Sequence, residues 1–303
     1  MTPLPTLRQL QFFIALAQQQ SFSRAADACL VSQSTLSAAI KELESTLDAQ
    51  LVDRSSRSFT LTPVGEVLVE RARALLAQAE DFARVARKSE PLSGVVNLGI
   101  IPTIAPYVLP KAMPQFRRKY PDLSLYLREA LSATLIDYVR SGQIDIALIA
   151  FPYNTEGLES LVFAEDSFLF ACSAEHRLAS RAEVSIDELN ARELLLLEDG
   201  HCLRDHALSA CQLQEKELAN TFGGTSIFTL AQMVRSGIGA TLLPEMAVRQ
   251  GLAKSSSLIT IPFREGKGET VPGRQIGFVW RKGSGRRQDV EAMEDIFTKV
   301  LSA

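Results

Sequence analysis

With 303 residues, the chain has room for two or three domains, each with a core of its own. Apolar residues make up 46% and charged residues 22%, which is ordinary for a globular protein, and no apolar run of about 18 residues predicts a membrane span. The net charge of −3 does not indicate nucleic-acid binding, so a role of that kind has to rest on a motif.

Two further features bear on the compartment. The beginning of the chain, Met1 to Leu4, leads into a polar-interrupted helix and does not have the pattern of a signal peptide. The four cysteines are unevenly spaced and do not form a disulfide framework. We therefore expect a cytoplasmic protein that has no membrane partner and in which any disulfide is transient and regulatory.

The first 50 residues have the spacing of a three-helix domain. Apolar periodicity predicts a helix over 6–20, Ser21 begins a short helix over 22–28, and Ser32 begins a third helix that includes Leu36, Ile40 and Leu43. Two helices joined by a tight turn are typical of a helix-turn-helix. Small polar residues at the start of the third helix are expected to meet double-stranded DNA: Ser32, Gln33, Ser34, Thr35 and Ser37.

A β-hairpin and a long helix are expected next. Residues 51–62 predict a wing with Arg54 and Arg57 at its tip, where they suit phosphate or minor-groove contacts. Thr62 and Pro63 then begin a helix to about residue 88. Its apolar residues follow steps of four and three, which indicate a dimer seam or, alternatively, packing on its own chain: Val64, Leu68, Ala72, Leu75, Ala79, Phe82 and Ala86.

After a linker at 91–94, strands and helices alternate, which implies a parallel sheet with helices on both faces. The expected strands are 95–101, 123–127, 144–149, 167–172, 194–197, 238–243 and 275–280. The expected helices are 107–119, 131–141, 202–211, 226–236 and 285–301. The last strand and helix return the chain to its first lobe, so we expect two lobes, about 91–164 with 271–303 and about 165–270.

The stretch from Leu197 to Cys211 carries the most distinctive chemistry. Buried-strand residues are followed by Glu198-Asp199-Gly200, which is a turn, and Cys202 is expected to open a helix. The helix dipole and the neighbouring His201 and Arg204 are expected to favour the Cys202 thiolate. This pattern indicates a reactive cysteine.

The spacing of the two cysteines in this stretch leads to a second expectation. If residues 202–211 form one helix, Cys202 and Cys211 lie about 13.5 Å apart along its axis and on opposite faces. A disulfide needs Cα atoms within roughly 7 Å. The two thiols can therefore bond only if the helix unwinds, which makes the pair a possible switch.

Two segments resemble one known family. The run SFSRAADACLVSQSTLSAAIKELE resembles the DNA-binding signature of LysR-type transcriptional regulators, with Ser34 where many members have proline. The run LEDGHCLRD followed by Cys211 resembles the redox segment of hydrogen-peroxide-sensing members. The resemblance implies an α+β multidomain fold: a winged helix-turn-helix over 1–62, a linker and dimerisation helix over 63–90, and a two-lobed α/β effector domain of periplasmic-binding-protein type over 91–303.

The resemblance also implies a mechanism. Peroxide oxidises Cys202 to a sulfenic acid, and Cys211 resolves it to a disulfide. Four residues match positions near the peroxide in relatives: Thr103, Ser132 (threonine in relatives), His201 and Arg274. Two more, Arg204 and Asp205, flank the cysteine. Asp205 is expected to orient His201 and Arg274. Further implications are a homotetramer, activation of antioxidant genes, contact with RNA polymerase, a thiol reductant, and no cofactor or metal.

Other interpretations of these residues remain open. Cys202 could be a buried structural thiol, or it could bind a metal together with His206, its i, i+4 neighbour. A LysR-type regulator that senses a small organic acid between its lobes would leave both cysteines inert. A thiol peroxidase would leave residues 1–90 without a role, and we expect no enzyme. Cys29 and Cys172 are expected to be packing residues.

Overall fold

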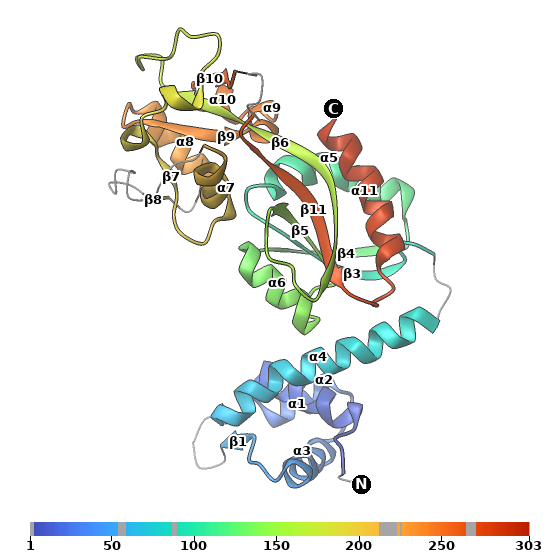
Figure 1. Ribbon diagram of the computed structural model, residues 1–303. Coiled ribbons are helices and arrows are strands. Elements are labelled where there is room, and N and C mark those ends of the chain that lie inside the picture. Colours follow the sequence, from blue (N-terminus) through green and yellow to red (C-terminus); the bar gives the residue numbers. More distant parts are fainter. Residues whose placement is uncertain are drawn as a thin grey trace. The chain divides into compact units, whose positions relative to one another are not determined.

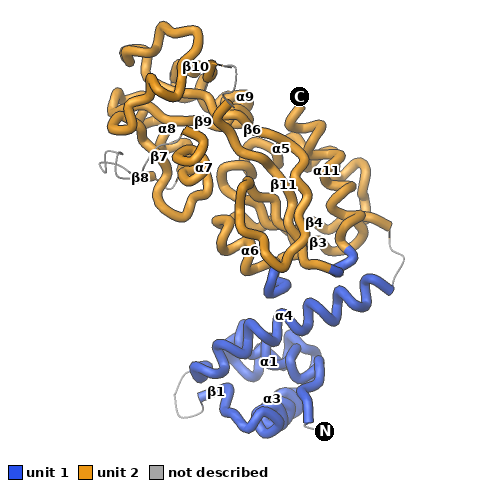
Figure 2. Tube along the Cα trace, in the orientation of Figure 1, with its two compact units in different colours: residues 1–89, 140–143, 283–285 blue, residues 90–139, 144–282, 286–303 orange. Residues whose placement is uncertain are grey.

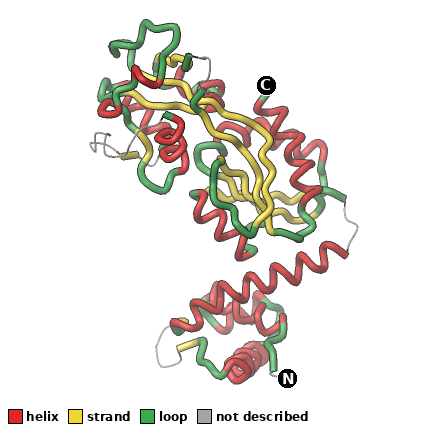
Figure 3. Tube along the Cα trace, in the orientation of Figure 1, coloured by secondary structure: helices red, strands yellow, loops and turns green. Residues whose placement is uncertain are grey.

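The structure is a computed structural model that describes residues 3–53, 59–86, 90–211, 223–224, 226–264 and 271–302. It divides into two compact units (Figure 2). One contains residues 1–89 with the short segments 140–143 and 283–285, and the other contains 90–139, 144–282 and 286–303. The first is mostly helical and the second combines strands with helices (Figure 3).

Three capped helices build the amino-terminal unit, as the sequence predicts. α1 (Leu7–Gln19), α2 (Phe22–Ala28) and α3 (Gln33–Leu47) begin after Thr6, Ser21 and Ser32, and each of these hydroxyls accepts a backbone N–H of the first turn. Their inner faces form one core, in which Leu16, Leu36, Ile40 and Leu43 are fully buried.

A short hairpin and a long helix complete this unit. β1 (Val52–Asp53) pairs antiparallel with β2 (Thr60–Leu61), and α4 (Pro63–Ala86) follows at once. The Thr62 hydroxyl caps α4 by accepting the Gly65 N–H at 3.0 Å. The tip of the predicted wing, with Arg54 and Arg57, lies outside the described residues.

The predicted seam of α4 is divided between two environments. Val64, Leu75 and Phe82 are 50%, 51% and 81% exposed and form an apolar stripe. Ala72 is buried in the core of α1–α3, so its assignment to the seam was wrong. The reason is that the same helix must also cover its own domain, and the small side chain lies on that side.

The second unit is built on a seven-stranded sheet with the path β10-β6-β11-β5-β3-β4, and β9 pairs with β6. In its first half, which we call lobe I, β3 (Gly94–Ile100) lies parallel to β4 (Leu123–Glu129) and β5 (Ile146–Phe151). Helices pack on this half and bury all six residues of β5. They are α5 (Ala105–Lys119), α6 (Ser132–Ser141) and α11 (Arg287–Leu301).

Two long strands run from lobe I into the second half, lobe II (Figure 1). They are β6 (Leu158–Cys172) and β11 (Gly273–Arg281), and they pair antiparallel. The expectation of a parallel sheet is therefore correct for β3, β4 and β5 and wrong for β6 and β11. The two strands oppose each other because one carries the chain out of lobe I and the other brings it back.

Lobe II surrounds the far end of β6. β9 (Ala240–Pro244) and β10 (Ile259–Pro262) flank that strand antiparallel, while β7 (Leu196–Leu197) pairs parallel with β8 (Gly223–Gly224). The remaining elements are α7 (Cys202–Ala210), α8 (Ile227–Arg235), α9 (Glu245–Arg249), α10 (Leu252–Ser255) and the 3-10 turns Ile186–Glu188 and Ala191–Glu193. The sequence did not indicate β10, α9 or α10, which are short.

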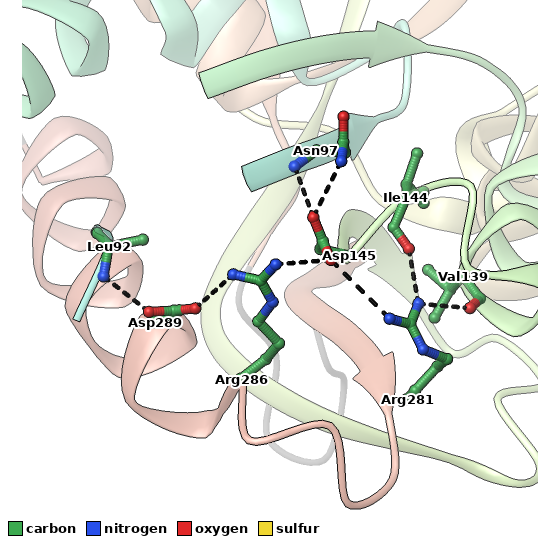
Figure 4. Close-up of polar contacts among 8 residues, drawn as sticks. All are labelled: Leu92, Asn97, Val139, Ile144, Asp145, Arg281, Arg286 and Asp289. Carbon is green, nitrogen blue, oxygen red and sulfur yellow. Dashed lines mark hydrogen bonds and ion pairs between the residues drawn. The ribbon is translucent and has the colours of Figure 1, made fainter. Parts of the chain in front are cut away.

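A buried ionic network closes the edge of lobe I where β3 and β5 begin (Figure 4). Asp145 accepts the backbone N–H of Asn97 at 2.8 Å and pairs with Arg286 at 2.7 Å. Arg286 also donates to Asp289 at 2.8 Å, and the other oxygen of Asp289 accepts the Leu92 N–H at 2.7 Å. The network thus fixes the first residues of this unit against α11.

Arg281 supports the same edge through backbone groups. Its guanidinium donates to the carbonyl oxygens of Val139 and Ile144 at 3.0 and 2.9 Å (Figure 4). These carbonyls lie in the last turn of α6 and in the loop before β5, and a buried carbonyl without a donor is costly. Arg281 therefore provides hydrogen-bond donors for the carbonyl groups of the segment that connects the helix to the strand.

We expect Asp289→Asn to lower the free energy of unfolding by about 3 kcal/mol, because it removes one partner of a buried ion pair. Glu291→Gln, on the same helix, is the control, since its ion pair with Arg287 (3.0 Å) is exposed. It should cost about 0–1 kcal/mol. Urea denaturation measures both, and equal losses would contradict the importance of the buried network.

Candidate functional site

The central group of the site is the buried guanidinium of Arg274 on β11. Its Nε donates to Asp166 at 3.0 Å, and its two terminal nitrogens donate to the hydroxyl and carbonyl oxygens of Thr103 at 2.8 and 3.0 Å. A fully buried positive charge requires such partners, because it has lost its hydration. Arg274 thereby joins β6 and β11 to the loop before α5.

Asp166 is the partner that the sequence did not identify. It lies directly across the β6–β11 pair from Arg274, and its second oxygen accepts the Met246 N–H at 3.0 Å. Asp205 was expected to orient Arg274, but Asp205 is exposed on α7 and Asp166 has that position instead. Asp166 and Arg274 are 108 residues apart in the chain, so no local sequence pattern indicates that they pair.

Cys202 is the first residue of α7 and is buried among residues of the lobe I core. Burial raises the pKa of its thiol, while the charge of Arg274 and the hydroxyl of Ser132 lower it. The expectation that the thiolate is favoured was therefore wrong for this state, because desolvation outweighs the nearby positive charge. The Ser132 hydroxyl oxygen is buried and, apart from this contact with the thiol, has no hydrogen-bond partner among the described residues.

Cys211 lies at the other end of the same helix, as predicted. It is the C-cap residue of α7 and is buried in the core of lobe II, where desolvation raises its pKa to about 12. The nine residues of α7 place the two sulfurs in separate hydrophobic clusters. Both thiols are free in this structure.

Two buried histidines belong to the same helix. His201 is the N-cap residue of α7, and burial lowers its pKa although Glu198 opposes this. His206 lies one turn after Cys202, and its Nε2 is 2.9 Å from the carbonyl oxygen of Pro152. Burial lowers the pKa of His206 as well. Neutral imidazoles therefore flank the cysteine.

Arg204 is held by the turn that precedes α7. Its Nε pairs with Asp199 at 2.9 Å, and Nη1 donates to the Leu197 carbonyl at 3.4 Å. The charge of the Arg274 guanidinium lowers the pKa of Cys202. The structure thus assigns the cationic influence on this cysteine to Arg274.

A cavity of about 700 Å³ lies beside Thr103, on the α5 side of the lobes. Its lining includes Tyr107, Glu129, Ser226 and Phe228. Burial raises the pKa of Tyr107 to about 12, and the tyrosine contacts the cores of both lobes. The sequence reasoning missed Tyr107, whose position in an ordinary amphipathic helix gave no signal.

The residues expected to meet DNA gather at the start of α3. Ser32, Gln33, Ser34 and Thr35 are exposed, and Ser37 is half-buried. The Ser32 hydroxyl is engaged by the helix cap and lies 2.9 Å from that of Ser34. The Gln33 amide oxygen accepts a hydrogen bond from the Ser23 hydroxyl of α2 at 3.0 Å, which fixes the orientation of the amide.

The remaining cysteines have packing positions, as expected. Cys172 is buried on β6, where desolvation raises its pKa to about 11, and Cys29 packs partly buried against the amino-terminal core. Within the described ranges, no group of three or more His, Cys, Asp or Glu side chains is placed to hold a metal ion. The structure therefore gives no support to the Cys202–His206 metal interpretation.

Family models match both units of the chain. Residues 7–66 match the "Bacterial regulatory helix-turn-helix protein, lysR family", and residues 89–302 match the "LysR substrate binding domain". The chain belongs to the LysR family of transcriptional regulators. The family accounts for a DNA-binding helix-turn-helix joined to a two-lobed effector domain.

Individual LysR-family relatives cover nearly the whole chain. The HTH-type transcriptional regulator EstR of Acinetobacter baylyi is 38% identical over 303 residues, with 100% of this chain and 99% of EstR covered. The hydrogen peroxide-inducible genes activator of Dickeya chrysanthemi is 37% identical, with 95% and 93% covered. A full-length OxyR variant from Pseudomonas aeruginosa has a TM-score of 0.79 at 33% identity, with 97% and 98% covered.

This LysR-family chain has no helix, among the residues described, with the length and apolar character that crossing a membrane requires. Its longest helix, α4, carries charged residues throughout, among them Glu66, Glu70 and Arg71.

The two neutral histidines make the stability of the reduced protein depend on pH. A pKa below the ordinary 6.5 in the folded state means that the unfolded chain binds more protons. Stability should therefore be fully present above pH 6.5 and decrease as the pH falls below it, by about 1.4 kcal/mol for each unit of pKa separation. Urea denaturation at pH 7.5 and 5.5 measures this, and His206→Gln should reduce the difference. An unchanged difference in the variant would contradict a buried neutral His206.

Proposed function

We propose that this protein is a hydrogen-peroxide-responsive transcription regulator that carries its sensor in α7. The observation that carries the proposal is the placement of two buried thiols at opposite ends of one short helix, with unpartnered polar atoms beside the first. Its relatives support it, since one is a hydrogen peroxide-inducible genes activator and several similar solved structures are OxyR proteins.

The chemistry has two balanced steps. The Cys202 sulfur attacks one peroxide oxygen, the O–O bond breaks, and the products are a sulfenic acid and water. The Cys211 thiol then attacks the sulfenic sulfur, which forms the disulfide and releases a second water. A thiol reductant must supply two electrons to restore both thiols.

The peroxide would be held by the polar atoms around Cys202. Ser132 offers a buried hydroxyl that lacks a full hydrogen bond, and Arg274 provides a fixed positive charge for the leaving hydroxide. Thr103 and His201 complete the proposed pocket. In this proposal Arg204 holds the start of α7 through its ion pair with Asp199. The exposed Asp205 acts on the site through its charge, which raises the pKa of Cys202 and of His206.

Disulfide formation would require a large local rearrangement. The helix separates the two cysteines by about 13.5 Å along its axis, whereas a disulfide needs Cα atoms within roughly 7 Å. At least one sulfur must leave its hydrophobic cluster. We propose that this change alters subunit packing, and thereby the DNA contacts and the activation of antioxidant genes.

The DNA-binding part of the proposal uses α3 and the wing. Gln33, Ser34, Thr35 and Ser37 would meet base edges, and Arg54 and Arg57 would contact the backbone or minor groove. Residues 1–62 would form the DNA-binding domain, 63–90 the dimerisation helix and 91–303 the sensing domain. A homotetramer that contacts RNA polymerase belongs to the same proposal.

One observation favours an alternative. The cavity of about 700 Å³ beside Thr103 has the size of a small-molecule site, and EstR is as similar to this chain as the peroxide activators are. In this alternative a small organic ligand binds between the lobes, and the cysteines are inert. Such a regulator would respond normally as the Cys202→Ser variant.

We expect one equivalent of hydrogen peroxide to give a Cys202–Cys211 disulfide and a changed DNA footprint. Thiol mapping by mass spectrometry and footprinting of the same sample measure the two effects. Cys202→Ser should abolish both, and Cys211→Ser should stop at the sulfenic acid, which a dimedone label reports.

Two results would decide against this function. If Cys202 remained a free thiol while the protein still bound DNA, the ligand alternative would take its place. If each subunit consumed many equivalents of peroxide per reduction cycle, the protein would be a thiol peroxidase. A sensor reacts about once per cycle.

We expect Phe82→Glu to weaken dimerisation, because it places a charge in the exposed apolar stripe of α4. Glu80→Gln changes the charge of the same helix by one unit at an exposed position outside that stripe and serves as the control. Sedimentation velocity over a range of concentrations measures both. A Phe82→Glu variant that associates as tightly as the control would remove α4 from the interface.

A further inference from the structure

His206 has one nitrogen that is fixed and one that is unused. Nε2 lies 2.9 Å from the carbonyl oxygen of Pro152, and a carbonyl can only accept, so Nε2 carries the proton. Nδ1 is therefore a lone-pair acceptor. It is buried and has no hydrogen-bond partner among the described residues. Most buried polar atoms in proteins are hydrogen-bonded, so a buried nitrogen without a partner is suited to accept a proton from a bound molecule or a neighbouring group.

The position of His206 on α7 brings that nitrogen to the side of Cys202. Residues four apart lie on the same face of a helix, and a long side chain leans toward the preceding turn. Both residues are buried on the side of lobe I, where Pro152 follows β5 and Cys202 joins the core. The charge of Arg274 lowers the pKa of both groups.

The peroxide reaction needs a proton acceptor. Two neutral imidazoles, His201 and His206, flank the thiol, and of these His206 has a buried Nδ1 without a partner among the described residues. The thiolate is the nucleophile, but burial raises the pKa of the Cys202 thiol, so the proton must be removed within the site. Arg274 cannot accept a proton, and the hydroxyls of Thr103 and Ser132 are very weak bases. A neutral imidazole with a free lone pair is suited to the task.

We propose that His206 Nδ1 is the proton-accepting group of the peroxide site; this inference rests on the function proposed above. Nδ1 takes the proton of Cys202, directly or through the bound peroxide, and the thiolate sulfur forms a bond to the nearer peroxide oxygen. The O–O bond breaks, sulfur is oxidised by two electrons and the farther oxygen is reduced. The imidazolium returns its proton to the departing hydroxide, which leaves as water.

The Pro152 carbonyl has the positioning role in this arrangement. By accepting from Nε2 it holds the ring in the tautomer that exposes the Nδ1 lone pair, and it stabilises the imidazolium that forms. Nucleophile, base and orienting acceptor thus come from Cys202, His206 and Pro152, the logic of an activated cysteine.

The test is the second-order rate constant for oxidation of Cys202 by hydrogen peroxide in the full chain, followed by stopped flow from pH 5 to 9. His206→Gln is the informative variant, because its side-chain amide can still donate to the Pro152 carbonyl but cannot accept a proton. We expect the rate constant at pH 7 to fall roughly 100-fold, the scale of general-base catalysis. The deficit should narrow toward pH 9, where solvent can remove the thiol proton.

The outcomes separate this inference from the proposed function. Should His206→Gln match the wild-type rate and pH profile, His206 is not the base, while loss of reaction in Cys202→Ser would still support the sensor. If the wild-type Cys202 itself fails to react, the proposed function is wrong. His206→Asn provides a second non-basic variant if the glutamine variant does not fold, and a wild-type-like profile in it would equally overturn the inference.

Discussion

The ion pair of Arg274 with Asp166 is the interaction on which the rest of the effector unit depends. The two residues are direct partners across the antiparallel strands that connect the lobes, and both side chains are almost completely buried. A charge in that position is tolerable only with partners on every side. Thr103 of lobe I and the N–H of Met246 in lobe II supply them, so the pair holds both lobes in one arrangement around the thiol.

Burial of Cys202 has a chemical consequence beyond protection. A thiol whose pKa is raised by desolvation is unreactive toward bulk solvent oxidants and electrophiles, because little thiolate is present. The opposing influences, Arg274 and Ser132, take effect only within the site. On the proposed chemistry, a peroxide molecule bound beside the thiol experiences both of them. Selectivity would then come from burial of the thiol and from fixed charges together.

Local sequence signals predicted much of the fold, and non-local pairing explains what they missed. Ser21, Ser32 and Thr62 marked helix starts because a cap acts within three residues. Cys211 at the end of α7 followed from the same helical spacing. Asp166 and Tyr107 were not identified, since their roles arise only when strands and lobes meet. The raised pKa of Cys202 was missed for the same reason: neighbours in sequence indicated charge, and only the fold determined burial.

The two thiols of α7 belong to different hydrophobic cores, and under the proposed function this separation opposes a gradual response. Any path that brings the sulfurs to bonding distance must break helical hydrogen bonds and withdraw one sulfur from a packed cluster. Packed cores are bistable and do not deform continuously, so intermediate positions of the helix are unfavourable. The disulfide would therefore hold a second, distinct arrangement of this segment. The same separation means that reduction releases the constraint and allows the helix to form again between the two cores.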